Sequence, residues 1–163
     1  MPISGDEYKE IGRAAAGAVS VVAAYDRRNN EPVALTVSSF VTLSFEPPLV
    51  MFAIQHNADS YPSMVSSQAF GVSLLSENQS ETARRFALKG RDKTAQTTFD
   101  SGVTLQVPLI PNSLAQIECL TNQIVLSGDH AIVIGMVETV RIFEGEPLLY
   151  FARRYGGFRP LSN

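Results

Sequence analysis

The chain has 163 residues, a formal net charge of −3, 45% hydrophobic residues and 18% charged residues. That length suits one domain with a sizeable core, so we expect a single domain over residues 1–163. The mildly acidic balance gives no reason to expect nucleic acid or an anionic membrane as a partner, and the longest apolar stretches, such as residues 49–54, are too short to span a bilayer.

The N-terminal residues show neither a basic start nor an apolar segment, so we expect no secretory signal. The single cysteine, Cys119, has no partner for an internal disulfide. We therefore expect a cytoplasmic protein in which Cys119 is a small buried side chain.

The first half of the chain predicts one helix followed by strands. Residues 4–16 favour a helix capped by Ser4 and ended by Gly17. The β-branched run 18–25 indicates a strand, and residues 32–45 indicate a strand pair. Residues 49–54, after two prolines, predict a further apolar strand.

The second half alternates short helices and strands before two long strands. A helix is expected within 58–67, then a strand over 69–75, then a helix capped by Ser76 or Asn78. Residues 90–112 are expected to form a loop with short strand pieces. The remaining predictions are long strands over 113–126 and 130–143 around a Gly128-Asp129 turn, a last strand over 147–151, and a loop-like tail over 155–158.

This order gives about seven or eight strands against two or three helices, without a regular alternation of strands and helices. The fold class we expect is mainly β, as a split β-barrel with two or three peripheral helices rather than a doubly wound sheet.

Several common functional motifs are absent from the sequence. It contains no phosphate-binding P-loop, no GxGxxG fingerprint, no GxSxG nucleophile elbow and no HExxH metal motif. Its two histidines, His56 and His130, lie far apart, and with only one cysteine we expect no metal site. Any nicotinamide cofactor would therefore bind in another way than on a Rossmann fold.

Hydroxyl side chains recur in the predicted strand that contains Thr36, Val37, Ser38 and Ser39. Alternation places Thr36 and Ser38 on one face of this strand, and small side chains there would leave room for a flat ligand. Taken alone, the stretch fits better with hydroxyls that face water on a strand surface.

Three further stretches could contact a phosphate or a ring. The segment 56–63 joins a strand to a helix and offers hydroxyls beside helix amides, although ordinary capping by Asp59 or Ser60 explains it as well. Residues 89–93 are a short cationic loop that could neutralise a phosphate or could simply face solvent. His130 follows a tight turn, where it could contact a ligand or serve only as a turn residue.

Together these stretches resemble the short-chain flavin reductases, the reductase components of two-component flavin-dependent monooxygenases, which have the FMN-binding split-barrel fold. The patterns T-x-S-S-F, S-x-x-P-P-L, G-D-H and P-L-L-Y-F follow one another in that order, and with Phe70–Leu75 they cover nearly the whole chain. Each pattern alone is weak, and the combination is specific.

The resemblance implies that FMN or FAD is reduced by hydride transfer from NADH or NADPH, by a homodimer that passes reduced flavin to a partner monooxygenase. It implies His130 as the catalytic residue, placed near the nicotinamide ring. The residues it implies for cofactor binding are Thr36, Val37, Ser38, Ser39, Asn57, Ser60, Ser63, Phe86, Ala87, Lys89, Arg91 and Tyr155, with Lys93 as a further candidate at the phosphate.

Two positions depart from the family pattern. Ala34 stands where the family often has glycine, and Asp92-Lys93-Thr94 stands where the family often has Asp-Arg-Phe. Either change could alter the choice between FMN and FAD. The alternatives that remain are a non-enzymatic flavin- or haem-binding split-barrel protein and an oxidase with tightly bound FMN, because one fold can host several functions.

Overall fold

The computed structural model describes residues 3–90 and 93–161. Within these two ranges, no helix is both long enough and apolar enough to cross a membrane. Arg91, one of the predicted phosphate-binding residues, lies outside the described residues.

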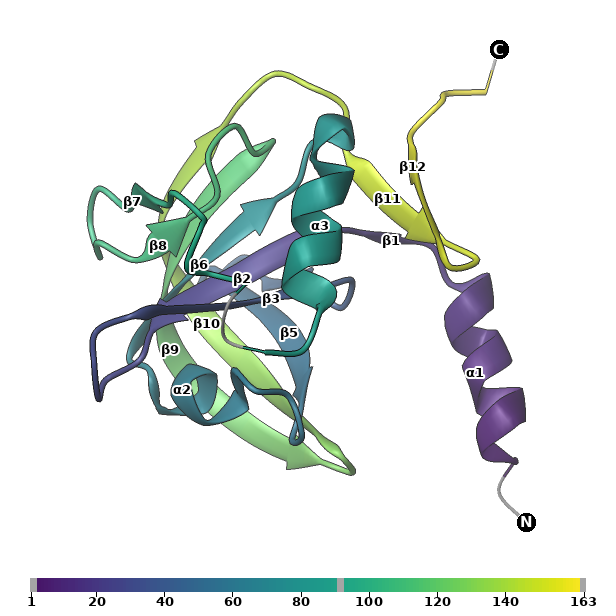
Figure 1. The fold of residues 1–163 in the computed structure, drawn as a ribbon, viewed down its shortest axis with the longest axis horizontal. Helices are drawn as coiled ribbons and strands as arrows, with labels where there is room; N and C mark the ends of the chain where they lie inside the picture. Colours follow the sequence, from purple (N-terminus) through teal and green to yellow (C-terminus); the bar gives the residue numbers. More distant parts are fainter. Residues whose placement is uncertain (1–2, 91–92, 162–163) are drawn as a thin grey trace.

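The described chain forms three α-helices, one 3-10 helix and twelve strands (Figure 1). In chain order the elements are α1 (Gly5–Ala14), β1 (Gly17–Ala18), β2 (Ser20–Tyr25), β3 (Pro32–Val37), β4 (Val41–Ser44), β5 (Leu49–Gln55), α2 (Tyr61–Ser66), β6 (Ala69–Leu74), η1 (Glu77–Gln79), α3 (Ser80–Ala87), β7 (Asp100–Ser101), β8 (Pro108–Leu109), β9 (Ala115–Ser127), β10 (His130–Ile142), β11 (Leu148–Phe151) and β12 (Arg154–Gly157).

Seven strands form one antiparallel sheet in the order β3-β2-β6-β9-β10-β5-β4. The long hairpin of β9 and β10 lies at its centre, and β3 and β4 are its edges. The hydroxyl of Ser39, which follows β3, accepts a hydrogen bond of 3.0 Å from the amide of Ala53 in β5. The sheet therefore curls until its two edge regions approach each other, which confirms the mainly β fold with peripheral helices.

The inside of the curled sheet holds the main hydrophobic core. In β5, alternate residues Val50, Phe52 and Ile54 are buried, as the period of a strand with one buried face requires. The rings of Phe52 and Phe70 meet edge to face, with 5.3 Å between their centroids. Gly135 makes this packing possible, since a Cβ there would lie 2.4 Å from the ring of Phe70.

Helix α3 covers the opposite face of β2 and β3 (Figure 1). Its buried residues Ala83 and Phe86 pack in a second core cluster with Val21 and Ala23 of β2. Because β2 is buried on both faces, it reads in the sequence as a continuous apolar run rather than as an alternating one.

A small sheet of β1, β11 and β12 lies beside the main sheet, and α1 extends from it (Figure 1). The expected loop over 155–158 is wrong, because residues 154–157 form β12. Ala152 and Arg153 make the connecting turn at φ values of 49° and 63°, a conformation that glycine or asparagine usually marks in a sequence.

The predicted end of the first helix at Gly17 is also wrong. The helix ends at Ala14, and Gly17 begins β1, where it pairs with Tyr150. A Cβ at Gly17 would lie 3.0 Å from the carbonyl oxygen of Ser38. Glycine is therefore needed there for close approach of two chain segments, not for a helix cap.

Candidate active site

A cavity of about 370 Å³ opens where the two edge regions of the main sheet approach each other. We call it the slot. Its walls come from the ends of β3 and β5, the segment before α2, the end of α3 and the start of β10. The lining residues are Leu35, Thr36, Val37, Ser38, Ser39, Ala53, Ile54, Gln55, Asn57, Ala58, Asp59, Ser60, Phe86, Ala87, Leu88, Lys89, Lys93 and His130.

The hydroxyls on the β3 side of the slot hold the walls together. Thr36 donates to the carbonyl of Ala83 in α3 at 2.7 Å, and Ser39 binds the backbone of Ala53. These two hydroxyls are already used within the protein. The interpretation of the stretch taken alone, with hydroxyls that face water, therefore does not hold for these two, which instead join the walls of the slot.

Backbone amides on the same wall remain available to a ligand. β3 is an edge strand with β2 as its one partner in the sheet. Across the described residues, the amides of Ser38 and Ser39 have no protein acceptor. Unpaired groups along a strand edge are natural sites for a ligand rich in carbonyls and ring nitrogens.

Ser60 lies at the junction between β5 and α2 and contributes a buried hydroxyl. The residue is 3% exposed, and its Oγ has no hydrogen-bond partner in the described part of the chain. Although Ser60 occupies the cap position of α2, its side chain makes no capping bond. A buried polar atom without a partner is costly, so its presence here indicates a group that a ligand satisfies.

Two lysines supply positive charge to the slot. Lys89 is exposed, whereas Lys93 is half-buried and donates from Nζ to the carbonyls of Leu88 at 3.1 Å and Phe86 at 3.4 Å. Burial lowers the pKa of Lys93, and the nearby carboxylate of Asp59 opposes that effect. These positions suit an anionic group such as a phosphate.

His130, at the start of β10, is oriented by the preceding residue. Its Nδ1 lies 2.6 Å from Oδ1 of Asp129, and this hydrogen bond is the main reason that the pKa of Asp129 is lowered. The amide of His56 donates to the carbonyl of Asp129 at 3.0 Å. Pairing of β5 with β10 thus brings together two histidines that lie far apart in the sequence.

The structure brings most of the predicted residues to one place. The slot is lined by Thr36, Val37, Ser38, Ser39, Asn57, Ser60, Phe86, Ala87, Lys89 and His130. The side chain of Phe86 is 1% exposed and packs in the second core cluster. Its polar contact at the slot is therefore made by its backbone carbonyl, which accepts a hydrogen bond from Lys93.

Two predicted residues lie beside the slot rather than in it. Ser63 lines a neighbouring recess, where its hydroxyl donates to Asp26 at 2.9 Å. Tyr155 lines a second cavity, which shares Thr36, Val37, Ser38 and Ala87 with the slot. Its ring lies 5.2 Å from that of Tyr150 and under the guanidinium of Arg84.

Sequence reasoning missed the contribution of β5 and the role of Asp129. Ala53 and Gln55 line the slot because the end of β5 lies beside His130 in the β5–β10 ladder. The apolar run 49–54 carried no polar signal for such a role. The carboxylate next to His130 was visible in the sequence, but the contact between the two side chains was not.

Comparison with known proteins identifies the family. Residues 12–159 match the flavin reductase like domain. The chain is 38% identical over 151 residues to the reductase component of 4-hydroxyphenylacetate 3-monooxygenase from Thermus thermophilus, covering 92% of this chain and 94% of that protein. The chain belongs to the flavin reductase family. The predicted activity class, an oxidoreductase that reduces flavin, is thereby confirmed.

Two other flavin reductases extend the comparison. The chain is 32% identical over 129 residues to SmoA of Agrobacterium fabrum, an FMN reductase (NADH), covering 78% of this chain and 72% of that protein. The solved structure of the Streptomyces globisporus NADH:FAD oxidoreductase SgcE6, in complex with NAD and FAD fragments, superposes with a TM-score of 0.88 and 26% identity, covering 100% of this chain and 99% of that one. Flavin and NADH are thus the cofactors of close flavin reductase relatives, in agreement with the prediction.

Proposed function

We propose that this flavin reductase transfers hydride from NADH or NADPH to FMN or FAD held in the slot, and that the reduced flavin then serves a partner monooxygenase. The observation that carries the proposal is the slot itself. It is lined by the amides of Ser38 and Ser39 and the hydroxyl of Ser60, none of which has a hydrogen-bond partner among the described residues, together with two lysines and His130.

The donors around the slot fit a flavin. Backbone amides at Ser38 and Ser39 suit the carbonyl oxygens and ring nitrogens of the isoalloxazine ring, on which negative charge develops during reduction. Asn57 suits the ribityl hydroxyls, Ser60 lies where it can reach the ribityl chain or the phosphate, and Lys89 and Lys93 suit the phosphate. We assign Arg91 to the same phosphate on sequence alone, and Ser63 to a supporting position behind Ser60.

The protein's own task is to hold two flat rings in contact. The flavin, when bound, supplies the ring that accepts the hydride. Hydride moves directly between the rings, so no acid and base pair is required at the carbon centre. Short side chains at 36–39 keep the slot open, and the bonds from Thr36 and Ser39 fix its width.

His130 and Tyr155 complete the nicotinamide side of the proposal. Asp129 fixes the orientation of the His130 ring, which lines the slot. Tyr155 stands next to the β3 wall in the adjoining cavity. We assign His130 to contact with the nicotinamide and Tyr155 to the adjoining part of the same site.

The assembly and location are also part of the proposal. One domain over 1–163, a homodimer and a cytoplasmic location are the forms we expect. The match over residues 12–159 supports the single domain, and the exposed apolar side chains of α1 support self-association.

The direct test is NADH and NADPH oxidation by the purified protein, with and without added FMN or FAD. We expect turnover that depends on added flavin. A yellow protein that binds flavin but oxidises neither nucleotide would instead be a carrier. Steady turnover without added flavin would indicate an oxidase with tightly bound FMN.

A substitution that fills the slot tests the location. Ser39→Trp should reduce NADH-dependent flavin turnover at least about tenfold, because the indole would occupy the space of the ring and binding depends on shape. The matched control is Thr42→Trp on the exposed edge of β4, which should leave turnover unchanged. Full turnover in a folded Ser39→Trp variant would refute this slot.

A further inference from the structure

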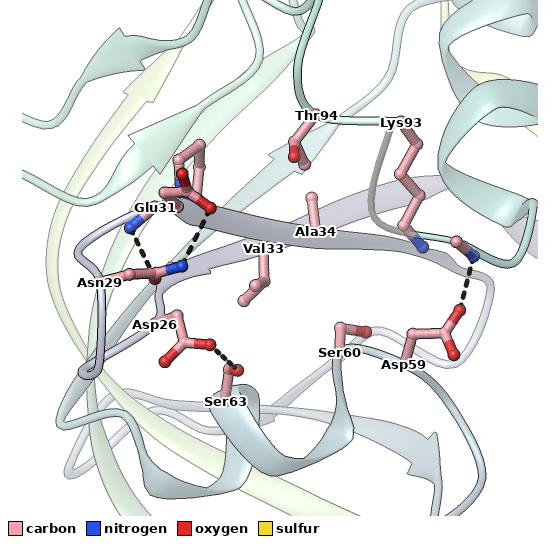
Figure 2. A pocket seen from close by; sticks show the side chains of 12 residues that line it. Asp26, Asn29, Glu31, Val33, Ala34, Asp59, Ser60, Ser63, Lys93 and Thr94 are labelled. Atoms are coloured by element: carbon pink, nitrogen blue, oxygen red, sulfur yellow. Dashed lines mark hydrogen bonds between the residues drawn. The ribbon is translucent and has the colours of Figure 1, made fainter.

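A recess adjoins the slot on the side of the hairpin between β2 and β3 (Figure 2). Asn29 and Glu31 of the hairpin line one side, and Asp59 and Lys93 line the opposite side, with β3 between them. Asp59, Ser60 and Lys93 line both the recess and the slot. The recess is therefore a lateral extension of the slot at its lysine-bearing end.

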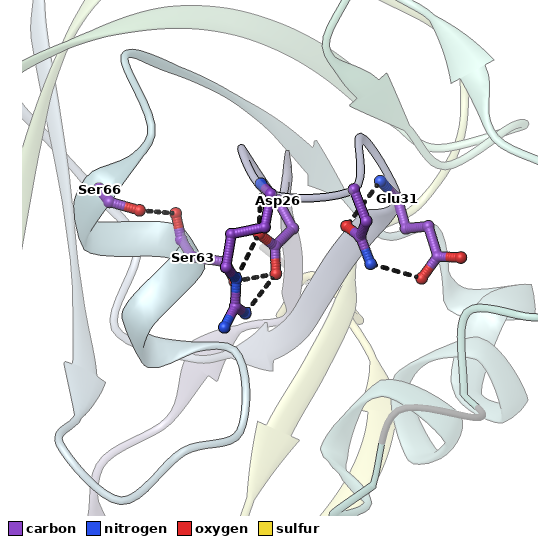
Figure 3. Close-up of polar contacts among 6 residues, drawn as sticks. Asp26, Glu31, Ser63 and Ser66 are labelled. Carbon is purple, nitrogen blue, oxygen red and sulfur yellow. Dashed lines mark hydrogen bonds and ion pairs between the residues drawn. The ribbon is translucent and has the colours of Figure 1, made fainter.

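The hairpin side of the recess is held rigidly by hydrogen bonds (Figure 3). Asp26 accepts from the backbone and guanidinium of Arg28 through one oxygen, and from Arg28 and Ser63 through the other. The carboxylate of Asp26 is thus fully used in shaping the loop. Its pKa is held well below the ordinary value by Arg28, so it stays ionised in that role.

Two other carboxylates, both on exposed residues at the rim of the recess, each have one oxygen without a hydrogen bond in the described part of the chain. Glu31 accepts from the side-chain amide of Asn29 at 2.9 Å through Oε2, and Asp59 accepts from the amide of Gly90 at 2.6 Å through Oδ2. Neither Oε1 of Glu31 nor Oδ1 of Asp59 has a hydrogen-bond partner in the described ranges. The recess thus offers acceptors for hydroxyl groups, in contrast to the amides and ammonium groups of the slot.

The junction between recess and slot carries hydrogen-bond donors, in contrast to the carboxylate acceptors of the recess. There the buried hydroxyl of Ser60 lacks a partner among the described residues, and Lys93 lines both spaces. A ligand that passes from slot to recess thus meets a cation and a hydroxyl first, and carboxylates next. That order matches a pyrophosphate followed by a sugar with free hydroxyls.

We propose that the recess binds the adenosine ribose of FAD, with its diol donating to Glu31 and Asp59, while the pyrophosphate passes Lys93 and Ser60. This inference rests on the proposed function, and it makes FAD the preferred flavin. The enclosed space is about 50 Å³, which suits the sugar edge and leaves the adenine at the surface. The protein should therefore bind FAD moderately, rather than very much, more tightly than FMN.

Equilibrium binding of FAD and of FMN, measured by quenching of flavin fluorescence, tests the recess. Wild type should bind FAD more tightly than FMN. Glu31→Gln, which keeps the shape and removes the charge, should raise the ratio of Kd for FAD to Kd for FMN about fivefold, as expected when a charged hydrogen-bond acceptor is replaced by a neutral one. Glu31→Trp, which fills the recess, should raise the same ratio at least as much.

The matched controls are Glu144→Gln and Glu144→Trp, in an exposed turn that lines neither cavity, and they should leave the ratio unchanged. An unchanged ratio in both Glu31 variants would overturn the inference, while flavin-dependent NADH oxidation would still support the proposed function. Absence of turnover with either flavin would instead refute the function.

Because NADH also carries an adenosine, the KM for NADH is measured in the same variants with FMN as acceptor. If FAD is the occupant, the KM for NADH stays within about twofold of wild type. A rise in that KM with an unchanged flavin ratio would assign the recess to the nicotinamide nucleotide and overturn the inference.

Discussion

Individual hydroxyl groups near the slot divide into two roles that the sequence does not separate. Thr36 joins β3 to α3 and Ser39 joins the end of β3 to β5, whereas Ser60 is buried without a hydrogen-bond partner in the part of the chain that the structure describes. All three looked alike as potential ligand donors. The difference lies in which backbone carbonyl or amide comes within reach after folding, and that depends on segments distant in the chain.

Asp129 is predicted to act through His130. In Asp129→Asn the ring loses its charged partner, so the KM for NADH should rise about threefold, the size expected for a solvent-exposed pair. Steady-state kinetics with NADH varied provide the measurement, and the Kd for flavin provides the contrast. Equal losses in NADH and flavin affinity would show that Asp129 shapes the site generally, and Asp6→Asn on exposed α1 is the control.

The ion pair of Asp26 predicts a pH-dependent contribution to stability. Arg28 lowers the pKa of Asp26 in the folded state relative to the ordinary value of 3.8. The stabilisation is therefore fully present above that value and is lost as the pH falls through the folded pKa. Asp26→Asn should unfold at lower urea concentration than wild type near neutral pH, and the two curves should converge in acid.

A constant difference between Asp26→Asn and wild type down to strongly acidic pH would contradict this assignment. Glu144→Gln, which removes an exposed carboxylate from a turn, should follow the wild-type curve throughout.

Among the elements, the loop between β7 and β8 depends on one buried side chain of β9. Glu118 is 1% exposed, and its carboxylate accepts from the amides of Val103, Thr104 and Leu105 at distances from 2.6 to 3.3 Å. Three donors satisfy the charge and fix the loop. The sequence showed a loop over 90–112 but gave no sign that a glutamate of β9 anchors it.

Gly102→Ala is predicted to disturb this anchor. Its Cβ would lie 2.4 Å from Oε2 of Glu118, whose position is set by the three amides, so the loop must shift at a cost of about 1–3 kcal/mol in the free energy of unfolding. Urea unfolding measures the loss. The matched control is Gly12→Ala in α1, where no atom lies within 4 Å of the new Cβ and stability should not fall. Equal stability in both variants would contradict the anchor.

Helices, strands and turns could be predicted from the sequence where a few neighbouring residues determine them. The capping box of Ser4 with Glu7 and the turn at Gly128 are encoded within a few residues, and the structure has both. The turn at Ala152 carried no such signal, so β12 was missed. Contacts such as those of Ser39 with Ala53, and of Asp129 with both histidines, depend on sheet curvature and strand pairing, which no short segment encodes.

At the scale of the whole molecule, α1 is an amphipathic helix joined to the β11–β12 turn at its C-terminal end, where the carbonyl of Arg13 accepts from the amide of Ala152 at 3.2 Å. None of its residues is buried, and Tyr8 and Ile11 are 67% and 58% exposed. Such an apolar stripe usually contacts another surface. Within the proposal above, that surface belongs to a second copy of the chain.

Sedimentation velocity over a concentration series should therefore show a dimer. The double variant Tyr8→Glu and Ile11→Glu should shift the equilibrium toward monomer, because two charges would be buried in the contact. Lys9→Glu, at an adjacent exposed position of the same helix, is the control for added negative charge. A wild-type monomer at all concentrations, or an unaltered dimer in the double variant, would refute the role of α1.

The open edge of β3 has a consequence for handling the protein. A strand edge with unpaired amides can template the pairing of another chain, and proteins normally protect such edges. Here a flavin in the slot would cover the amides of Ser38 and Ser39. The ligand would thereby protect this edge from pairing with another chain, as a covering strand or helix does in other proteins. Colloidal stability should then depend on flavin supply: preparations stripped of flavin should aggregate faster on storage, and added flavin should slow that aggregation.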